Sequence, residues 1–192
     1  GFGDQNVVRP QGQILIHSNT VSNSLQFGIV ADAGARDISS LAPLAGSLPH
    51  AGPVRVTREV NPQRLVTGVT IANNLVARNG TGGILVSGDP TVAGDLLQLS
   101  AVPFGRVFNN TIVGSGSGVG IQVEENVSPT LLNNIVSKLG VGISVDPTAT
   151  STIIGGTVYQ SNAASVTGTG LGSFPISLTS ADPLFVDADQ GN

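Results

Sequence analysis

The sequence contains no cysteine, methionine or tryptophan, and it has only one tyrosine and six phenylalanines among its 192 residues. The absence of cysteine excludes a disulfide framework and a thiolate metal site. Hydrophobic residues make up 40% of the chain but aromatic residues only 4%. The core must therefore be built from Ile, Leu and Val, which favours a narrow core of stacked aliphatic side chains.

Charge is also scarce. Charged residues supply 10% of the chain, with a net charge of −4, whereas an average soluble domain has about 25%. The eight basic residues are scattered, which argues against the basic patch that a nucleic acid partner requires. We find no signal peptide and no apolar run of the roughly 18 residues that a membrane span needs. If the protein is secreted, its export signal is expected outside these residues.

Glycine is abundant, with 26 residues, and four of them begin the same short pattern of glycine, isoleucine, any residue and a hydrophobic residue. An asparagine followed by a short apolar run precedes each copy by 8 to 10 residues. So constant an offset indicates one supersecondary unit used repeatedly. The glycines of the repeat are Gly28, Gly83, Gly120 and Gly142, and its asparagines are Asn19, Asn74, Asn110 and Asn134.

The last two glycines of the repeat are 22 residues apart, which predicts a bare unit of about 22 residues. The earlier spacings of 55 and 37 residues are interpreted as two loop insertions, at about 32–64 and 87–105, because insertions in repeat proteins map to loops. The chain is long enough for one continuous core, so we expect a single domain over residues 1–192.

Each unit is predicted to hold three short strands rich in β-branched residues, separated by an asparagine turn and a Gly/Ser turn. No window keeps a helical stripe for long. Three strands in a period in the low twenties wind most economically as a right-handed parallel β-helix, in which each strand pairs with its equivalents in the neighbouring coils. The predicted fold is therefore an all-β solenoid.

Pairs of asparagines at 73–74, 109–110 and 133–134 mark one predicted corner of this solenoid. Asparagine tolerates the left-handed backbone conformation that a sharp corner needs. Stacked copies also predict an amide ladder along the corner. The alternative is that asparagine is simply a common turn residue, but its fixed position relative to the glycines favours the ladder.

The pattern Asn-Asn-x-Ile/Val followed by Gly-Ile-x-Val, over residues 13 to about 160, resembles the parallel β-helix family typified by pectate lyases and related polysaccharide-active proteins. The resemblance implies the fold and says little about activity. Residues 181–187 also resemble a segment that often ends β-helices in large bacterial surface proteins, usually with one more strand after it. This implies an extracellular or cell-surface protein that belongs to a longer array or completes its end against a neighbour.

Both insertions follow the Gly-Ile-x-Val strand in successive coils, so we expect them to form one wall, which holds nine of the 20 charged residues. A β-eliminating lyase needs a base and a cation, for which the weak candidates are Asp32, Arg58, Arg78 and Asp89. A glycoside hydrolase would need two facing carboxylates. The signatures of polygalacturonases and alginate epimerases are missing, and the charges can simply solvate the loops. Whether the protein is an enzyme stays open, with the balance against it.

Alternating oxygen ligands at Asp187 and Asp189 partly resemble a calcium loop, but the glutamate of its twelfth position would lie beyond Asn192. We interpret this segment as a terminal turn, leave calcium as an alternative and expect no other cofactor. His17 and His50 are not in metal-ligand spacing with another ligand.

A solenoid end exposes unpaired strand edges and apolar core, and residues 1–10 show no amphipathic helix that would cap it. We therefore expect a structural or adhesive module whose partners are other domains or copies of itself, bound through its ends. The alternatives are a polysaccharide lyase or hydrolase, and a glycan-binding module without catalysis. Amide-rich faces suit sugar hydroxyls, although Phe27 and Phe104 are expected in the core or a cap.

Overall fold

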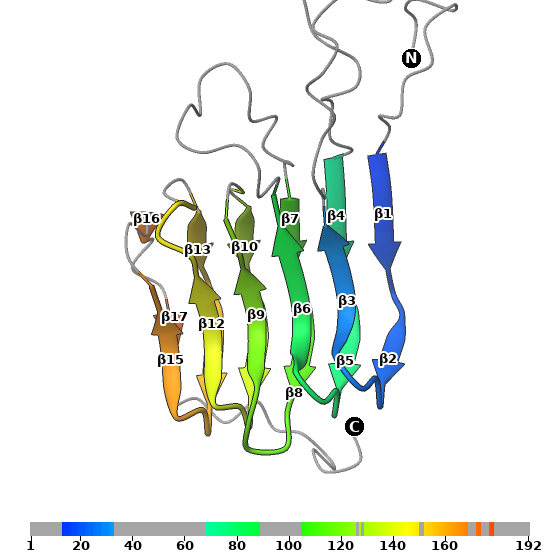
Figure 1. Ribbon diagram of the computed structural model, residues 1–192, viewed down its shortest axis with the longest axis vertical. Coiled ribbons are helices and arrows are strands. Elements are labelled where there is room, and N and C mark those ends of the chain that lie inside the picture. Colours follow the sequence, from blue (N-terminus) through cyan, green and yellow to red (C-terminus); the bar gives the residue numbers. More distant parts are fainter. Residues whose placement is uncertain are drawn as a thin grey trace, which may run out of the picture.

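The computed structural model describes residues 13–32, 68–88, 105–125, 127, 129–149, 152–168, 172–173 and 177–178. All the regular elements in these ranges are β-strands, numbered β1 to β17. Each strand pairs with strands three places away in the sequence, and every pairing is parallel. Figure 1 shows equivalent strands of successive coils side by side along the solenoid.

Three sheets, here named A, B and C, form the walls of the solenoid. Sheet A contains β1 (Gln13–His17), β4 (Gly68–Ala72), β7 (Gly105–Phe108), β10 (Thr130–Leu132), β13 (Ile153–Gly155) and β16 (Gly172–Ser173). Sheet B contains β2 (Thr20–Ser22), β5 (Leu75–Ala77), β8 (Thr111–Val113), β11 (Ile135–Ser137), β14 (Thr157–Gln160) and β17 (Ser177–Leu178). Sheet C contains β3 (Phe27–Asp32), β6 (Gly82–Ser87), β9 (Val119–Val123), β12 (Val141–Val145) and β15 (Ala164–Thr167). The predicted right-handed parallel β-helix with three strands per coil is confirmed.

The coils have the predicted length where no insertion interrupts them. Arg106, Thr130 and Ile153 are register partners in sheet A, so successive coils differ by 24 and then 23 residues. The first predicted insertion, at about 32–64, falls between the end of β3 at Asp32 and the start of β4 at Gly68. The second, at about 87–105, falls between the end of β6 at Ser87 and the start of β7 at Gly105. The insertions themselves, 33–67 and 89–104, lie outside the described residues.

The core is a stack of aliphatic side chains, one rung per coil. Strand alternation points every second residue inward. Register pairing then stacks each inward side chain on its partner in the next coil. The strand segments are short and β-branched because each side chain must fit between its equivalents in the coils on either side. The inward columns are Ile71, Val107, Leu131 and Ile154 in sheet A, Val76, Ile112, Val136 and Tyr159 in sheet B, and Ile29, Ile84, Ile121 and Ile143 in sheet C.

The repeated glycines make room for the inward column of sheet B. A Cβ atom at Gly28 would lie 2.6 Å from Cγ1 of Val76, and one at Gly83 would lie 2.5 Å from Cγ2 of Ile112. At Gly142 it would lie 2.9 Å from Cδ1 of Tyr159. None of these glycines has a positive φ, so close packing selects glycine at these positions, and backbone conformation does not.

The repeated asparagines form a hydrogen-bonded ladder inside the corner between sheets A and B. Nδ2 of Asn74 donates to Oδ1 of Asn110 over 2.9 Å, and Nδ2 of Asn110 donates to Oδ1 of Asn134 over 3.1 Å. Backbone N–H groups also donate to the ladder oxygens: the N–H of Asn74 donates to Oδ1 of Asn110. The second Nδ2 proton of Asn74 is donated to the Ile16 carbonyl oxygen of the preceding coil. The buried amides of Asn74 and Asn110 thereby each tie three coils together.

The ladder includes Asn19 in the first coil and ends at the fifth. Nδ2 of Asn19 donates to Oδ1 of Asn74 over 3.1 Å. In the fifth coil the equivalent residue is Thr157, whose hydroxyl donates to the Gly155 carbonyl oxygen of its own coil. The residue before each ladder position turns the corner with φ between 53° and 57°, and these residues are Ser18, Asn73, Asn109 and Asn133.

Tyr159 is the largest fully buried side chain of the described core, with 2% of its surface exposed. Its hydroxyl has no hydrogen-bond partner among the described residues, and the nearby Thr157 hydroxyl donates to the Gly155 carbonyl oxygen. Burial raises the pKa of Tyr159 from 10.0 to about 12, and Thr157 offsets a smaller part of this rise. The folded state therefore favours the neutral phenol.

Stability should depend on Tyr159 at alkaline pH. A raised folded-state pKa means that its contribution is present below about pH 10 and is lost as the pH rises towards 12. Because it is the only tyrosine and tryptophan is absent, near-ultraviolet absorbance of tyrosinate reports this one group. Tyr159→Phe should remove this alkaline loss and stabilise the fold by about 1 kcal/mol at neutral pH, since it deletes an unpaired buried hydroxyl. A titration midpoint near 10 in the folded protein would contradict the buried position.

Candidate functional site

A column of polar residues lies at the edge where sheet C ends and the insertions begin. Asp32 and Ser87 are register partners at the ends of β3 and β6. Glu124 and Asp146 directly follow Val123 and Val145, which are register partners in the next two coils. We call Asp32, Ser87, Glu124, Glu125 and Asp146 the acidic rim.

Hydrogen bonds fix the side chains of the rim. Oγ of Ser87 donates to Oδ1 of Asp32 over 2.8 Å, which links the first two coils. Nε2 of Gln122 donates to Oε1 of Glu124 over 2.9 Å. The backbone also continues the sheet into the rim, because the N–H of Glu124 donates to the Val86 carbonyl oxygen.

The rim carries one perturbed carboxyl group. Burial raises the pKa of Glu124 above its usual value, and the negative charge of Glu125 raises it further. The hydrogen bond from Gln122 lowers it, and the charges of Asp32 and Asp146 add smaller increases. A rise in the pKa of a carboxyl group is the direction of change that a general acid needs.

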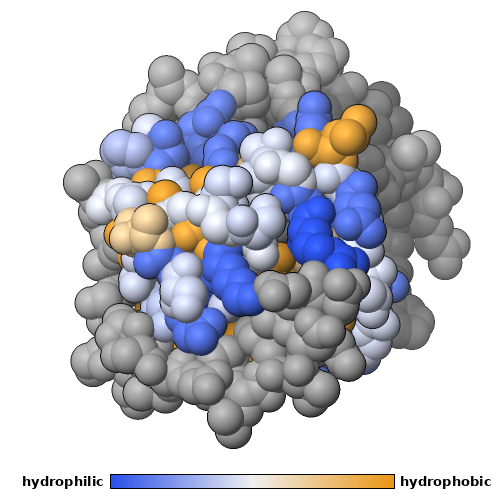
Figure 2. Space-filling view, turned by 90° about the horizontal axis from the view of Figure 1, so that it is seen from below, coloured by the Kyte–Doolittle hydropathy of each residue, from blue (hydrophilic) through white to orange (hydrophobic). Residues whose placement is uncertain are grey.

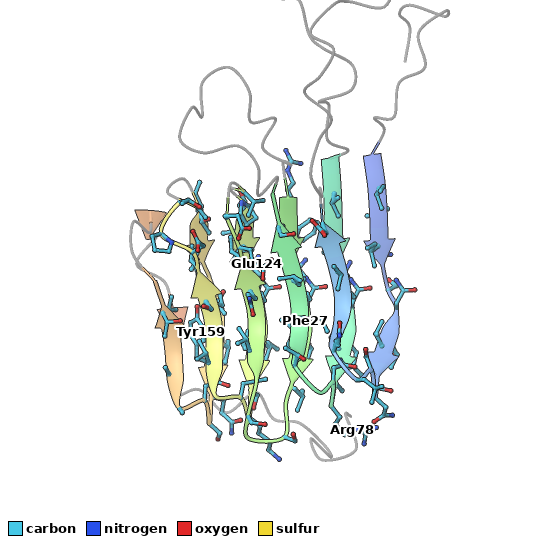
Figure 3. All side chains as sticks on the ribbon, viewed as in Figure 1. Phe27, Arg78, Glu124 and Tyr159 are labelled. Carbon is cyan, nitrogen blue, oxygen red and sulfur yellow. The ribbon has the colours of Figure 1, made fainter. Side chains whose placement is uncertain are left out.

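The structure separates two of the residues that the sequence suggested as parts of one lyase site. Asp32 ends β3 at the rim, whereas Arg78 follows β5 in the turn between sheets B and C. Figure 3 shows Glu124 of the rim and Arg78 at opposite ends of the strands. The structure does not bring Asp32 and Arg78 together, because one length of sheet C lies between these positions. Arg58, Asp89, Asp187 and Asp189 lie outside the described residues.

The described flanks of the two insertions agree with the prediction that these segments emerge together. They leave sheet C at Asp32 and Ser87, which are partners, and return to sheet A at Gly68 and Gly105, which are one position apart in register. The rest of the predicted wall, including His50, is not described.

The sequence reasoning missed Glu124, Glu125 and Asp146. A usable signal was present, since Asp32, Glu124 and Asp146 each directly follow the hydrophobic residue that ends a Gly-Ile-x-Val pattern. Because equivalent positions of a solenoid stack, that shared offset is enough to place these carboxyl groups in one column.

Neither the rim nor any other part of the described chain brings together three or more His, Asp or Glu side chains in a form that could hold a metal ion. His17 lies away from the rim. Nε2 of its ring is 2.9 Å from Nδ2 of Asn73. The described residues also contain no helix with the length and apolarity that a membrane crossing requires.

The turns between sheets B and C form a different kind of surface. Figure 2 views this side and shows mainly hydrophilic residues, with small hydrophobic groups between them. Phe27 lies at this end of β3 and packs its ring against Gly82, which agrees with a packing role for this aromatic residue. Comparison with known protein families, curated proteins and solved structures found no match to the chain.

Proposed function

We propose that this protein is an extracellular structural or adhesive β-helix module that associates with a second copy of itself through its first coil. The observation that carries the proposal is the incomplete burial of β1, β2 and β3 at one end of the solenoid. Neither a metal nor an organic cofactor is part of the proposed role. The sequence resemblance of residues 181–187 to a segment that often ends β-helices in large bacterial surface proteins supports a scaffold of this kind at a cell surface.

The first coil carries exposed apolar side chains, some of them at outward positions whose partners in later coils are polar or partly buried. Leu15, Leu25 and Val30 are 64%, 93% and 53% exposed, and all the exposed large hydrophobic residues of the described chain belong to this coil. Inward residues are affected too, because Ile16 and Val21 are only partly buried whereas their partners Ile71 and Val76 are each 1% exposed. Covering these groups would be favourable in proportion to the apolar area removed from water.

The hydrogen bonds between successive coils also stop at the first coil. β1, β2 and β3 are the edge strands of sheets A, B and C, so one side of each lacks a partner among the described strands. In the ladder, Oδ1 of Asn74 accepts two hydrogen bonds from Asn19. Within the described residues no equivalent donor reaches Oδ1 of Asn19. An edge of this kind is a template for pairing with another chain.

The other end is less suited to the same contact. There β16 and β17 have two residues each, and Thr157 closes the ladder on its own coil. Two copies would thus meet most favourably with first coil against first coil, which buries the same apolar groups on both. A contact of this type has two-fold symmetry and closes as a dimer.

The acidic rim supports a second candidate function, hydrolysis of a polysaccharide. Burial and the nearby carboxyl groups raise the pKa of Glu124 above its usual value, which is the direction that a general acid needs. A reducing-sugar assay on neutral and uronic-acid polymers separates the two functions. The structural proposal predicts no product, whereas turnover that is lost in Glu124→Gln would favour the hydrolase.

A lysine substitution on the edge of the first coil tests the structural proposal. Leu15→Lys places a charge on an exposed position of β1, where it should block pairing of edge strands without disturbing the core. Sedimentation velocity across a dilution series should show a dimer for the unchanged protein and a monomer for this variant. Thr130→Lys is the matched control, because Thr130 occupies the equivalent outward position inside sheet A.

The control should remain a dimer, since its strand is already paired on both sides. An unchanged protein that stays monomeric at every concentration would overturn the proposal. Equal dissociation of both lysine variants would also overturn it, because the effect would then come from charge alone.

A further inference from the structure

Exposed asparagines form a second amide column, separate from the buried ladder. Asn73, Asn109 and Asn133 are exposed, and each turns the corner between sheets A and B with φ of 53° to 55°. The residues before them, Ala72, Phe108 and Leu132, are register partners, so the three amides stack one per coil. We call these six residues the outer corner strip.

Backbone geometry alone does not explain three successive asparagines. The left-handed positions in the turns between sheets B and C are held by Asn23, Arg78, Lys138 and Ser161. The solenoid therefore accepts several residue types at such a position. In the outer corner the backbone N–H groups are already paired, as Asn73 donates to the Phe108 carbonyl oxygen and Asn109 to that of Leu132. The side chains are left available for another role.

The exposed amides of the strip keep hydrogen-bonding capacity, whereas the amides of the buried ladder are already paired with each other. Nδ2 of Asn73 is 2.9 Å from Nε2 of His17. Within the described residues, no hydrogen bond reaches the side chains of Asn109 and Asn133. Their regular spacing follows that of the strands, about 4.8 Å per coil. The strip therefore presents a row of groups that can each donate and accept hydrogen bonds.

An aromatic ring lies in the same strip. Val107 is fully buried and points inward, so the alternation of β7 places Phe108 on the outer face. Phe108 is only partly buried there, with the apolar side chain of Leu132 next to it in register. The other described aromatic residues serve packing, because Tyr159 is in the core and Phe27 lies against Gly82. Phe108 is thus available as an apolar platform.

The strip itself carries no charge. The acidic residues of the described chain lie on the rim, and Arg78 and Lys138 lie in the turns between sheets B and C. Arg106 is the nearest described charged residue in the strand, two positions before Phe108. A surface of amides around one aromatic ring matches a partner that is rich in hydroxyl groups and uncharged.

We propose that the outer corner strip binds a neutral polysaccharide chain laid along the solenoid axis. Phe108 contacts the apolar face of one sugar ring, while Asn73, Asn109 and Asn133 exchange hydrogen bonds with hydroxyl groups of successive sugars. This ligand site goes beyond self-association, because it uses a side wall of the solenoid and leaves the first-coil edge free.

Affinity electrophoresis tests the site with soluble polymers cast in the gel. The probes are a neutral β-glucan, a mannan and a dextran, with polygalacturonate as the charged comparator. The full chain should be retarded by at least one neutral polymer. Phe108→Ala should weaken that retention about tenfold, as should the combined variant Asn73→Gly, Asn109→Gly and Asn133→Gly. Glycine keeps the left-handed backbone while removing the amide.

Asn23→Gly is the matched control, since Asn23 has the same backbone conformation with φ of 60° in the opposite turn. It should leave retention unchanged, and circular dichroism should show that all variants keep the fold. No retention by any neutral polymer would overturn the proposal. Retention that the strip variants leave intact, or retention by polygalacturonate alone, would overturn it as well. Sedimentation of the same samples reports self-association separately, so failure of one proposal does not imply failure of the other.

Discussion

Asn110→Ala is expected to lower the free energy of unfolding by roughly 3–5 kcal/mol. The amide of Asn110 is fully buried and joins three coils. Its Oδ1 accepts from the backbone N–H and Nδ2 of Asn74, and its Nδ2 donates to Oδ1 of Asn134 and to the Ile71 carbonyl oxygen. Alanine would leave buried donors and acceptors without partners in two neighbouring coils, and each stranded group costs about 1–3 kcal/mol.

Urea unfolding followed by circular dichroism measures this loss. Asn109→Gly provides the control in the same coil, because that amide is exposed and the residue turns the corner with φ of 55°. Glycine adopts this left-handed conformation readily, so the control should lower the free energy of unfolding by less than about 1 kcal/mol. Similar losses in both variants would mean that the turn, and not the buried ladder, holds the corner together.

Gly120→Ala is expected to cost about 3 kcal/mol through overpacking. A methyl group there would overlap the Gly142 carbonyl oxygen and Cγ1 of Val136, and it would lie 3.0 Å from Cδ1 of Leu139. The carbonyl belongs to the backbone of the next coil and cannot move without disturbing sheet C. The spacing between two coils would therefore have to change.

Gly68→Ala is the control for this substitution. A Cβ atom at Gly68 meets nothing within 4 Å, and the residue has no positive φ. Its stability should change by less than about 0.5 kcal/mol in the same urea experiment. A tolerated alanine at Gly120 would contradict the close packing of the repeat glycines against the inward column of sheet B.

The coil architecture could be predicted because its constraints act on single residues at fixed offsets. The ladder requires a side-chain donor and acceptor on a short stem at Asn74, Asn110 and Asn134, and asparagine supplies both. Only glycine fits beside the sheet B column at Gly83 and Gly120. Both residue types therefore recur in the sequence with the period of the coil.

The candidate sites were harder to predict, because outward positions carry no packing constraint. The rim accepts Asp, Ser or Glu at one equivalent position, so residue type there shows no repeat. Charge alone suggested Arg78 as a partner of Asp32, although the two lie at opposite ends of sheet C. The sequence does not show which way the Phe108 side chain faces, and only the register with strand alternation places it outward beside the exposed amides.

The proposed roles use separate parts of one rigid scaffold. Self-association uses the edges of β1, β2 and β3, whereas the glycan site uses the side wall of the second to fourth coils. A dimer formed through the first coils would hold two such walls in a fixed relation. Binding one polymer at two sites increases avidity without new contacts, provided that the geometry allows both to engage. Such a particle would suit adhesion to a polysaccharide surface.

Amide hydrogen exchange of the first coil, measured as a function of protein concentration, tests self-association most directly. Unpaired edge N–H groups in β1, β2 and β3 exchange rapidly in a monomer and become protected when another chain pairs with them. We expect their protection to rise with concentration while that of the interior strands β8 and β9 stays constant. First-coil exchange that is independent of concentration would contradict the account.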